Sequence, residues 1–136
     1  MTPTHRVLVV DDEPAIRTMV AIALEDQGCE VRTAANGHQA LDVIATWQPS
    51  LTLLDLNMPV LNGYGFAGAL REQGTRLRIC LMTSDPEAAR AAETIGASGI
   101  LAKPFTIHQL IETVERQCAE DVAELPAARG SAPPQC

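Results

Sequence analysis

Aromatic side chains are scarce in this sequence of 136 residues, at 3% of the total, with one Trp, one Tyr and two Phe. A core built from Val, Leu, Ile and Ala suits helices packed on a β-sheet better than an aromatic-rich β-sandwich. Long apolar runs are also missing. The first apolar run, residues 7–10, is too short for a signal peptide or a membrane span, so we expect a cytoplasmic protein with no membrane partner.

Positive charge is in short supply, since ten Lys and Arg face 17 Asp and Glu for a net charge of −7. An acidic domain gains nothing from counterion release on DNA or RNA, so direct nucleic-acid binding is not expected. The cysteines form no CxxC pair, and no His lies at zinc spacing from them. They are Cys29, Cys80, Cys118 and Cys136, which we interpret as reduced thiols.

Five short apolar runs alternate with five helical patterns. The expected strands are residues 7–10, 30–33, 51–54, 78–82 and 99–102, and the expected helices are residues 14–27, 38–47, 64–72, 86–95 and 107–124. The first and third runs are almost continuously apolar, as in central parallel strands covered on both faces. Strict alternation predicts an α/β fold, in which a doubly wound, five-stranded parallel sheet carries helices on both faces.

Polar side chains directly follow four of these strands. They are Asp11, Asp12 and Glu13 after the first strand, Asp55 after the third, Thr83, Ser84 and Asp85 after the fourth, and Lys103 after the fifth. Functional groups of parallel α/β sheets lie in the loops at the carboxyl ends of the strands. We therefore expect these side chains to converge at one edge of the sheet.

The converging groups suit phosphoryl transfer. Crowded carboxylates repel one another unless a cation lies between them, and oxygen ligands suit Mg²⁺. The cation and the ammonium of Lys103 would neutralise charge on the phosphoryl oxygens, while the hydroxyl of Thr83 would donate a hydrogen bond to one of them. Asp55 is then the nucleophile that forms an acyl phosphate. A lone Asp at a strand end is usually a turn or a helix cap, so the argument depends on the whole group.

Four segments resemble the receiver domain of bacterial response regulators. They are Val-Leu-Val-Val-Asp11-Asp12-Glu13-Pro14, Leu-Leu-Asp55-Leu-Asn-Met-Pro59, Met-Thr83-Ser and Lys103-Pro104-Phe105. Each segment alone is weak, but all four in order, each at the end of its own strand, are a strong signal. The resemblance covers residues 5–120 and implies a flavodoxin-like fold with strand order 2-1-3-4-5.

The resemblance also implies a function: a phosphorylation-dependent switch in two-component signalling, without turnover of a separate substrate. Asp55 would be the phosphoacceptor. Asp12 and Asp55 would bind Mg²⁺ directly, Asp11 would bind it through water, and Asn57 would contribute its backbone carbonyl. The phosphoryl donor would be a histidine kinase or a histidine phosphotransfer protein, and the output would pass to a protein partner or a phosphorylation-dependent homodimer.

Two further roles follow from the same resemblance. Lys103 would pair with the phosphoryl group or with the acceptor carboxylate. Thr83 would move its hydroxyl onto a phosphoryl oxygen and draw the loop before the fourth helix with it; capping that helix is its alternative role.

Partner docking would use the first helix and the loop after Lys103. The residues implied are Ile16, Arg17, Val20, Pro104 and Phe105, although the apolar ones could equally belong to the core. For Asn57 and Asp85, an influence on hydrolysis of the phosphoryl group is as well supported as a role as solvated loop residues. Glu13 is equally open.

One position departs from the family pattern. Many members carry Tyr or Phe three residues before the lysine, where this chain has Ile100. A β-branched aliphatic side chain is stiff at its first torsion and offers no hydroxyl or ring to a partner. Phosphorylation is not affected by this difference, but the usual aromatic output is. Trp47 is expected to pack at the end of the second helix, and His5, His38 and His108 are scattered away from the acidic group.

Three alternatives remain at this point. A haloacid-dehalogenase-type phosphohydrolase would carry its nucleophile in a DxD motif after the first strand, where this chain has Asp11-Asp12. A receiver-like scaffold that is not phosphorylated would not need the intact acidic group. A Rossmann nucleotide-binding module is disfavoured because no GxGxxG or GxxxxGK[ST] follows the first strand. We expect one domain over residues 1–120, then a helix extension and a Pro- and Ala-rich tail or linker over residues 121–136.

Overall fold

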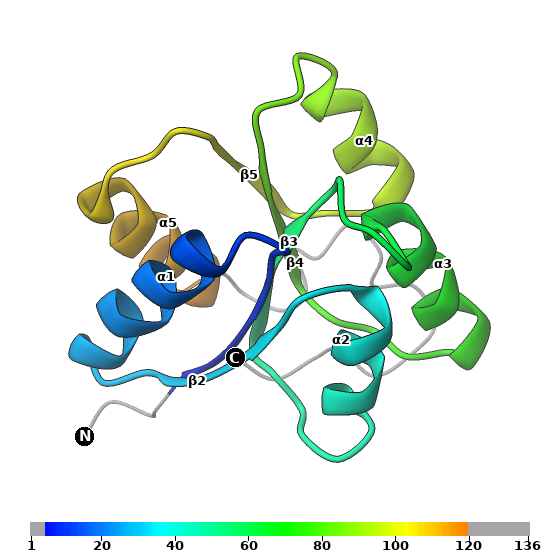
Figure 1. The fold of residues 1–136 in the computed structure, drawn as a ribbon, viewed down its shortest axis with the longest axis horizontal. Helices are drawn as coiled ribbons and strands as arrows, with labels where there is room; N and C mark the ends of the chain where they lie inside the picture. Colours follow the sequence, from blue (N-terminus) through cyan, green and yellow to red (C-terminus); the bar gives the residue numbers. More distant parts are fainter. Residues whose placement is uncertain (1–4, 120–136) are drawn as a thin grey trace.

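The computed structural model describes residues 5–119 and shows a layered α/β fold in which strands and helices alternate (Figure 1). The strands are β1 (Arg6–Val10), β2 (Glu30–Ala34), β3 (Leu51–Asp55), β4 (Ile79–Thr83) and β5 (Gly99–Ala102). The helices are α1 (Pro14–Asp26), α2 (Gly37–Ile44), α3 (Gly63–Gln73), α4 (Ala88–Ile95) and α5 (Ile107–Ala119).

The five strands form one parallel sheet in the order β2-β1-β3-β4-β5. This confirms the predicted doubly wound, flavodoxin-like arrangement. In the register of the central strands, Val10 pairs with Leu54 and Asp55 pairs with Met82. The carboxyl ends of β1, β3 and β4 therefore finish side by side.

Burial explains which strands are central. The residues of β3 and β4 are buried throughout, and in β1 only Arg6 is exposed, whereas the edge strands β2 and β5 each expose part of their length. Continuous burial requires cover on both faces, which the helices provide. The apolar runs of β1 and β3 were recognisable for this reason.

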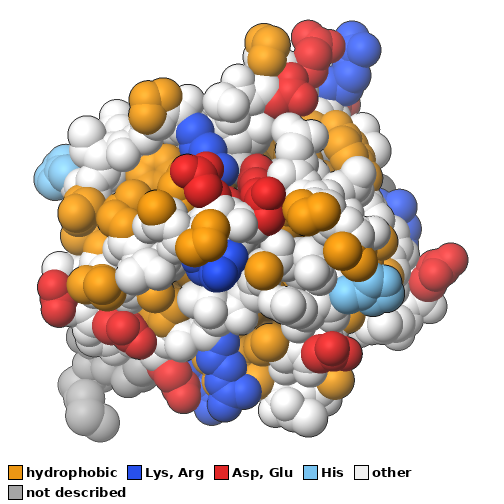
Figure 2. Space-filling model, in the orientation of Figure 1, with side chains coloured by type: hydrophobic (Ala, Val, Ile, Leu, Met, Phe, Trp, Pro, Cys, Tyr) orange, Lys and Arg blue, Asp and Glu red, His pale blue; other side chains and the backbone are white. Residues whose placement is uncertain are grey.

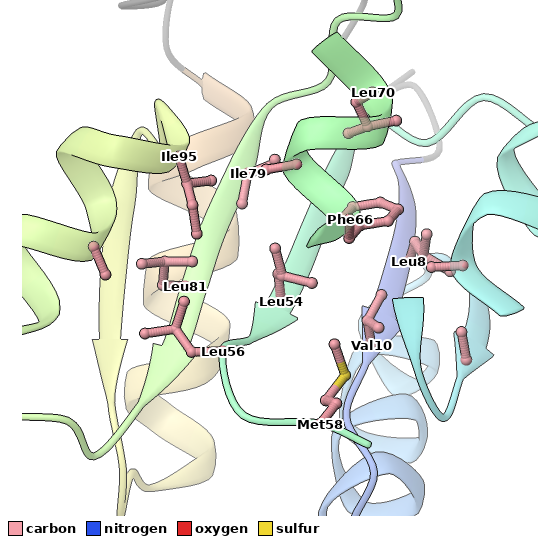
Figure 3. Packing of buried hydrophobic residues seen from close by; sticks show 14 of the residues in the cluster. Leu8, Val10, Leu54, Leu56, Met58, Phe66, Leu70, Ile79, Leu81 and Ile95 are labelled. Atoms are coloured by element: carbon pink, nitrogen blue, oxygen red, sulfur yellow. The ribbon is translucent and has the colours of Figure 1, made fainter. Parts of the chain in front are cut away.

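Two apolar cores lie on opposite faces of the sheet. On one face, alternate strand residues such as Val9, Leu53 and Met82 pack against α1 and α5. On the other face, Leu8, Val10, Leu54, Ile79 and Leu81 pack beneath α2, α3 and α4. Figure 3 shows Phe66 and Leu70 of α3 among these strand residues, with Ile95 of α4 next to Ile79 and Leu81. The period of two along each strand thus sorts its side chains between two helix layers.

Helix boundaries follow from specific residues. The side-chain oxygens of Asn36 and Asn62 accept hydrogen bonds from the N–H groups of Gln39 and Gly65, at 2.9 Å each, and so cap the starts of α2 and α3. Gly74 ends α3 with a φ of 72°, a left-handed conformation that glycine adopts without a steric penalty.

Several predicted boundaries were wrong by one to three residues. Helix α2 begins at Gly37 and ends at Ile44, so Trp47 lies beyond it, although Trp47 is buried and packs in the core as predicted. Strand β4 includes Thr83 but not Arg78, and α4 begins at Ala88 rather than at residue 86. The predicted extension of α5 to residue 124 and the tail over residues 121–136 lie outside the described residues.

Other expectations concern the thiols and the membrane. Cys29 and Cys80 are free thiols, and burial raises the pKa of the Cys80 thiol to about 12. Between residues 5 and 119, no helix has the length and apolarity that crossing a membrane requires.

Candidate functional site

Three carboxylates meet at the carboxyl edge of the sheet. Asp11 and Asp12 follow β1, and Asp55 is the last residue of β3. Val10 pairs with Leu54, so the residues that follow these two in the chain, Asp11 and Asp55, lie next to each other. One oxygen from each of the three carboxylates lies within 4.8 Å of the others. Asp11 is fully buried and Asp55 is 6% exposed, while Asp12 is exposed.

Asp11 is fixed by hydrogen bonds on every side. Its N–H donates to the carbonyl of Ala34 at 3.1 Å, and its Oδ1 accepts from the N–H of Glu13 at 2.9 Å. Its Oδ2 accepts from the ammonium of Lys103 at 2.8 Å, and its carbonyl accepts from the guanidinium of Arg17 at 2.7 Å. A buried carboxylate held in this way keeps a defined position.

Lys103 brings positive charge to the site from the loop after β5. Its N–H donates to the carbonyl of Thr83 at 2.9 Å, which fixes the backbone there. Its ammonium contacts Asp11 at 2.8 Å and Oδ1 of Asp55 at 3.7 Å. Burial acts to lower the pKa of Lys103, but the hydrogen bond that its ammonium donates to Asp11 and the charges of Asp11, Asp55 and Glu13 outweigh it and raise the pKa. Lys103 therefore stays charged.

Asp55 has an unusually basic carboxyl group. Burial, followed by the negative charge of Asp11, raises its pKa from 3.8 to about 6. The charge of Lys103 and a hydrogen bond from the backbone N–H of Asn57 act in the opposite direction, and Asp12 raises the pKa slightly further. A cation between the carboxylates would relieve the repulsion that remains.

Thr83 lies at the end of β4, one residue beyond Met82, the partner of Asp55. It is buried, and its hydroxyl oxygen accepts a hydrogen bond from the N–H of Asp85 at 3.0 Å. The carboxylate of Asp85 in turn accepts from the N–H of Glu87 at 2.8 Å. Thr83 therefore orders the loop before α4, and it is not the N-cap of that helix, which is Glu87.

The remaining residues singled out in the sequence lie either at the rim of the site or away from it. Asn57 is exposed at the rim, two residues after Asp55, and Ile100 is 37% exposed on β5. His108 pairs with Glu112 on α5 at 3.3 Å, outside the acidic group. Of the two roles left open for Val20, core packing is the correct one, because this α1 residue is fully buried against the sheet.

Arg17 is the site residue that the sequence analysis missed. The family resemblance implies only a role in partner docking for it, whereas its guanidinium reaches back to the carbonyl of Asp11. The available signal was its position in the first turns of a helix that starts directly after the acidic residues. Charge patterning of this kind does not by itself give the direction of a long side chain.

The fold and the site together define a class of protein: a doubly wound α/β domain with three carboxylates and a lysine at the carboxyl edge of its parallel sheet. The family model for the response regulator receiver domain matches residues 7–115. The chain belongs to this family.

Relatives of known name and structure agree with this assignment. The chain is 36% identical over 140 residues to the alkaline phosphatase synthesis transcriptional regulatory protein SphR of Synechococcus elongatus, covering 93% of this chain and 54% of SphR. It is 36% identical over 118 residues to the regulatory protein AtoC of Escherichia coli, covering 85% of this chain and 26% of AtoC. The chain thus spans about half the length of SphR and about a quarter of AtoC.

Among solved structures, the chemotaxis response regulator CheY4 of Vibrio cholerae is similar over its full length. The TM-score is 0.78 at 37% identity, covering 85% of this chain and 99% of that chain. A putative response regulator from Chloroflexus aurantiacus has a TM-score of 0.79 at 33% identity, covering 87% of this chain and 100% of that chain.

Proposed function

We propose that this receiver domain is a phosphorylation-dependent signalling switch that accepts a phosphoryl group on Asp55 in the presence of Mg²⁺. The observation that carries the proposal is the position of Asp55. It ends a buried strand, with a carboxylate oxygen within 4.8 Å of those of Asp11 and Asp12, and it lies 3.7 Å from the ammonium of Lys103.

The donor set fits Mg²⁺. Three carboxylates close together supply the hard oxygen ligands that this ion prefers, and exposed Asp12 leaves room for the waters that it usually keeps. We propose Asp12, Asp55 and the backbone carbonyl of Asn57 as direct ligands, with Asp11 acting through water. Bound Mg²⁺ would neutralise charge on the carboxylates and on the phosphoryl oxygens.

The chain's own residues then account for the transfer from a phosphohistidine. A P–O bond forms at a carboxylate oxygen of Asp55 while the P–N bond of the donor breaks. The electron pair of the broken bond stays on the imidazole nitrogen, which takes up a proton from water. Lys103, held beside Asp55 by Asp11, balances the negative charge of the phosphoryl oxygens.

The switch itself would involve Thr83. Its hydroxyl now accepts a hydrogen bond from Asp85 and stands at the start of the loop before α4. A phosphoryl group on Asp55 adds about −1.5 to −2 of charge and several strong acceptors, which would draw the hydroxyl towards it. Movement of Thr83 breaks its turn with Asp85 and rearranges the loop. Since Ile100 replaces an aromatic side chain, the output would be read from this loop rather than from a rotating ring.

An apolar groove is the surface that we propose for docking of a histidine kinase or phosphotransfer protein. It lies between α1 and α5, has a volume of about 420 Å³, and is lined chiefly by Met19, Ile22, Ala23, Ile107 and Ile111. Ile22 and Ile107 are both about half exposed, which is unusual for large aliphatic side chains. Figure 2 shows hydrophobic side chains gathered on the same face as the charged groups near its middle.

The proposal concerns a signalling protein that turns over no separate substrate. The free thiols of Cys29 and Cys80 support the reducing cytoplasm as its location.

Intact mass measurement tests the proposal directly. The protein is incubated with Mg²⁺ and acetyl phosphate or phosphoramidate and then weighed. We expect the gain of one phosphoryl group in the unchanged protein. No gain is expected when Mg²⁺ is chelated before the incubation, nor in Asp55→Asn. Asp42→Asn, which changes an exposed carboxylate on α2, should be phosphorylated like the unchanged protein. Absence of any gain in the unchanged protein would refute the proposal.

A further inference from the structure

Arg17 makes a contact that partner docking does not explain. It lies one turn into α1, where its N–H donates to the carbonyl of Glu13 at 3.0 Å. From there its side chain runs back across the start of the helix, and Nη1 lies 2.7 Å from the carbonyl oxygen of Asp11. Arg17 is half-buried in this position.

We propose that Arg17 is a positioning residue for the metal site, acting through the peptide that joins Asp11 to Asp12. This inference rests on the proposed function, because it concerns the Mg²⁺ bound by the three carboxylates. Arg17 touches neither carboxylate that would bind the ion directly, so it is not itself a ligand.

Every polar atom of Asp11 has a hydrogen-bond partner. Its N–H, Oδ1 and Oδ2 are bound by Ala34, Glu13 and Lys103, which leaves the carbonyl as its remaining polar atom. Arg17 takes that carbonyl with a charged donor, and hydrogen bonds of this kind are short and strong.

The carbonyl of Asp11 belongs to the same planar peptide as the N–H of Asp12. Holding the oxygen fixes the orientation of that plane and so the point from which the side chain of Asp12 starts. Asp12 is exposed, so the core does not hold its side chain in place. Fixing this peptide is how the chain aims Asp12 towards the oxygens of Asp11 and Asp55.

Electrostatics alone would give Arg17 the opposite effect. A guanidinium near three carboxylates repels an incoming Mg²⁺, so its removal should tighten binding of the ion. Positioning predicts that removal weakens binding, because Asp12 loses its orientation. The two accounts therefore differ in the sign of a measurable change.

The experiment measures Mg²⁺ affinity by isothermal titration calorimetry of metal-free protein, for the unchanged protein, Arg17→Met and Arg17→Lys. We expect Arg17→Met to weaken Mg²⁺ binding by about tenfold, in line with other groups that orient metal ligands. Arg17→Lys, which keeps the charge on a shorter side chain, should lie between the two. Amide hydrogen exchange of Glu13 in the metal-free protein should also become faster in Arg17→Met, since its acceptor on Asp11 is less fixed.

Arg71 provides a matched control. Its guanidinium also donates to a backbone carbonyl, that of Thr94 at 3.3 Å, but it joins α3 to α4 away from the acidic residues. Arg71→Met should change Mg²⁺ affinity by no more than about twofold. Urea unfolding of each variant shows whether it is folded; should Arg17→Met not fold, the comparison of Arg17→Lys with the unchanged protein decides.

The outcomes separate the inference from the proposed function. Equal affinity of Arg17→Lys and the unchanged protein, or tighter binding by Arg17→Met, overturns the positioning role while leaving the metal site intact. Absence of Mg²⁺ binding in the unchanged protein refutes the proposed function itself.

Discussion

The ammonium of Lys103 lies closer to Asp11 than to Asp55, at 2.8 Å from one carboxylate and 3.7 Å from the other. One positive charge thus faces two buried carboxylates and forms its short hydrogen bond with Asp11. Asp55 keeps the weaker contact, which only partly offsets burial and the charge of Asp11, and these two raise its pKa to about 6. The carboxylate that we propose as the nucleophile is therefore the one whose negative charge Lys103 neutralises less.

The raised pKa of Asp55 predicts a pH-dependent stability of the metal-free protein. Because the pKa is higher in the folded state than its ordinary value of 3.8, protonation of Asp55 stabilises the fold. This stabilisation is fully present below 3.8 and is lost as the pH rises through about 6. Relative to Asp55→Asn, the free energy of unfolding should fall by at most about 3 kcal/mol between those limits.

Urea denaturation in a chelator across a pH series measures this difference. Asp42→Asn, on the exposed face of α2, serves as the control and should parallel the unchanged protein. Parallel curves for Asp55→Asn and the unchanged protein would show that folding does not raise the pKa of Asp55.

Replacing Lys103 should cost stability as well as phosphorylation. Lys103→Met leaves the carboxylate of Asp11, which is fully buried, without its ammonium. We expect a loss of about 2–4 kcal/mol in the free energy of unfolding without Mg²⁺, because an uncompensated buried charge is costly. Saturating Mg²⁺ should restore part of the loss. The rate of labelling by acetyl phosphate should fall in the same variant.

A double-mutant cycle with Asp11→Asn checks the origin of the loss. If the cost comes from the unpaired charge, Lys103→Met should be much less destabilising when Asp11 is already Asn. Equal costs in both backgrounds would contradict the pairing.

Two glycines of α3 should respond to the same substitution with opposite sign. A Cβ at Gly63 would lie 3.0 Å from the carbonyl oxygen of Asp55 and 3.1 Å from the Cα of Leu56, both of them backbone atoms. Gly63→Ala should therefore destabilise the fold by about 1–3 kcal/mol. A Cβ at Gly68 meets nothing within 4 Å, so Gly68→Ala should stabilise the helix by about 0.5–1 kcal/mol.

Urea unfolding of the two variants is the measurement, and each serves as the control of the other. Because Gly63 touches the backbone of Asp55, Gly63→Ala should also slow labelling by acetyl phosphate. A neutral or stabilising result at Gly63 would mean that the start of α3 can move away from β3 at little cost.

The proposed docking groove is tested by a charge placed in it. Ile22→Glu puts a carboxylate at the half-exposed position between α1 and α5. Transfer from a phosphorylated histidine phosphotransfer protein should slow by about tenfold, since an apolar contact is lost and a charge is desolvated. Labelling by acetyl phosphate, which needs no docking, should stay unchanged. Ala89→Glu adds the same charge at an exposed position of α4 and should not affect transfer; equal rates for both variants would exclude the groove.

Much of the fold could be predicted from the sequence because its signals are local. The apolar runs of β1 and β3, Pro14 at the start of α1 and Gly74 after α3 each act within a few residues. Placement of Asp11 and Asp55 at one edge followed from the parallel topology, since strand ends on the same edge of a sheet must be neighbours.

What could not be predicted depends on contacts between distant segments. Lys103 and Asp11 are 92 residues apart, and no local pattern says that Lys103 binds Asp11 more closely than Asp55. The helical pattern predicted a helix that includes Trp47, but α2 ends at Ile44. Trp47 instead packs against β2, where the guanidinium of Arg32 lies 4.9 Å from the centre of its ring. For Val20 the sequence left docking and core packing open, because helical periodicity does not show which neighbours cover a face; the structure buries it completely.

Lys103 is also the only lysine in the sequence. Reagents that acylate amines therefore have one side-chain target, and it lies inside the candidate site. Acylation would convert the ammonium into an uncharged amide between Asp11 and Asp55. Coupling the protein to a surface or a dye through its amines would consequently risk disabling the site, whereas the extent of acylation at Lys103 would report how accessible that ammonium is.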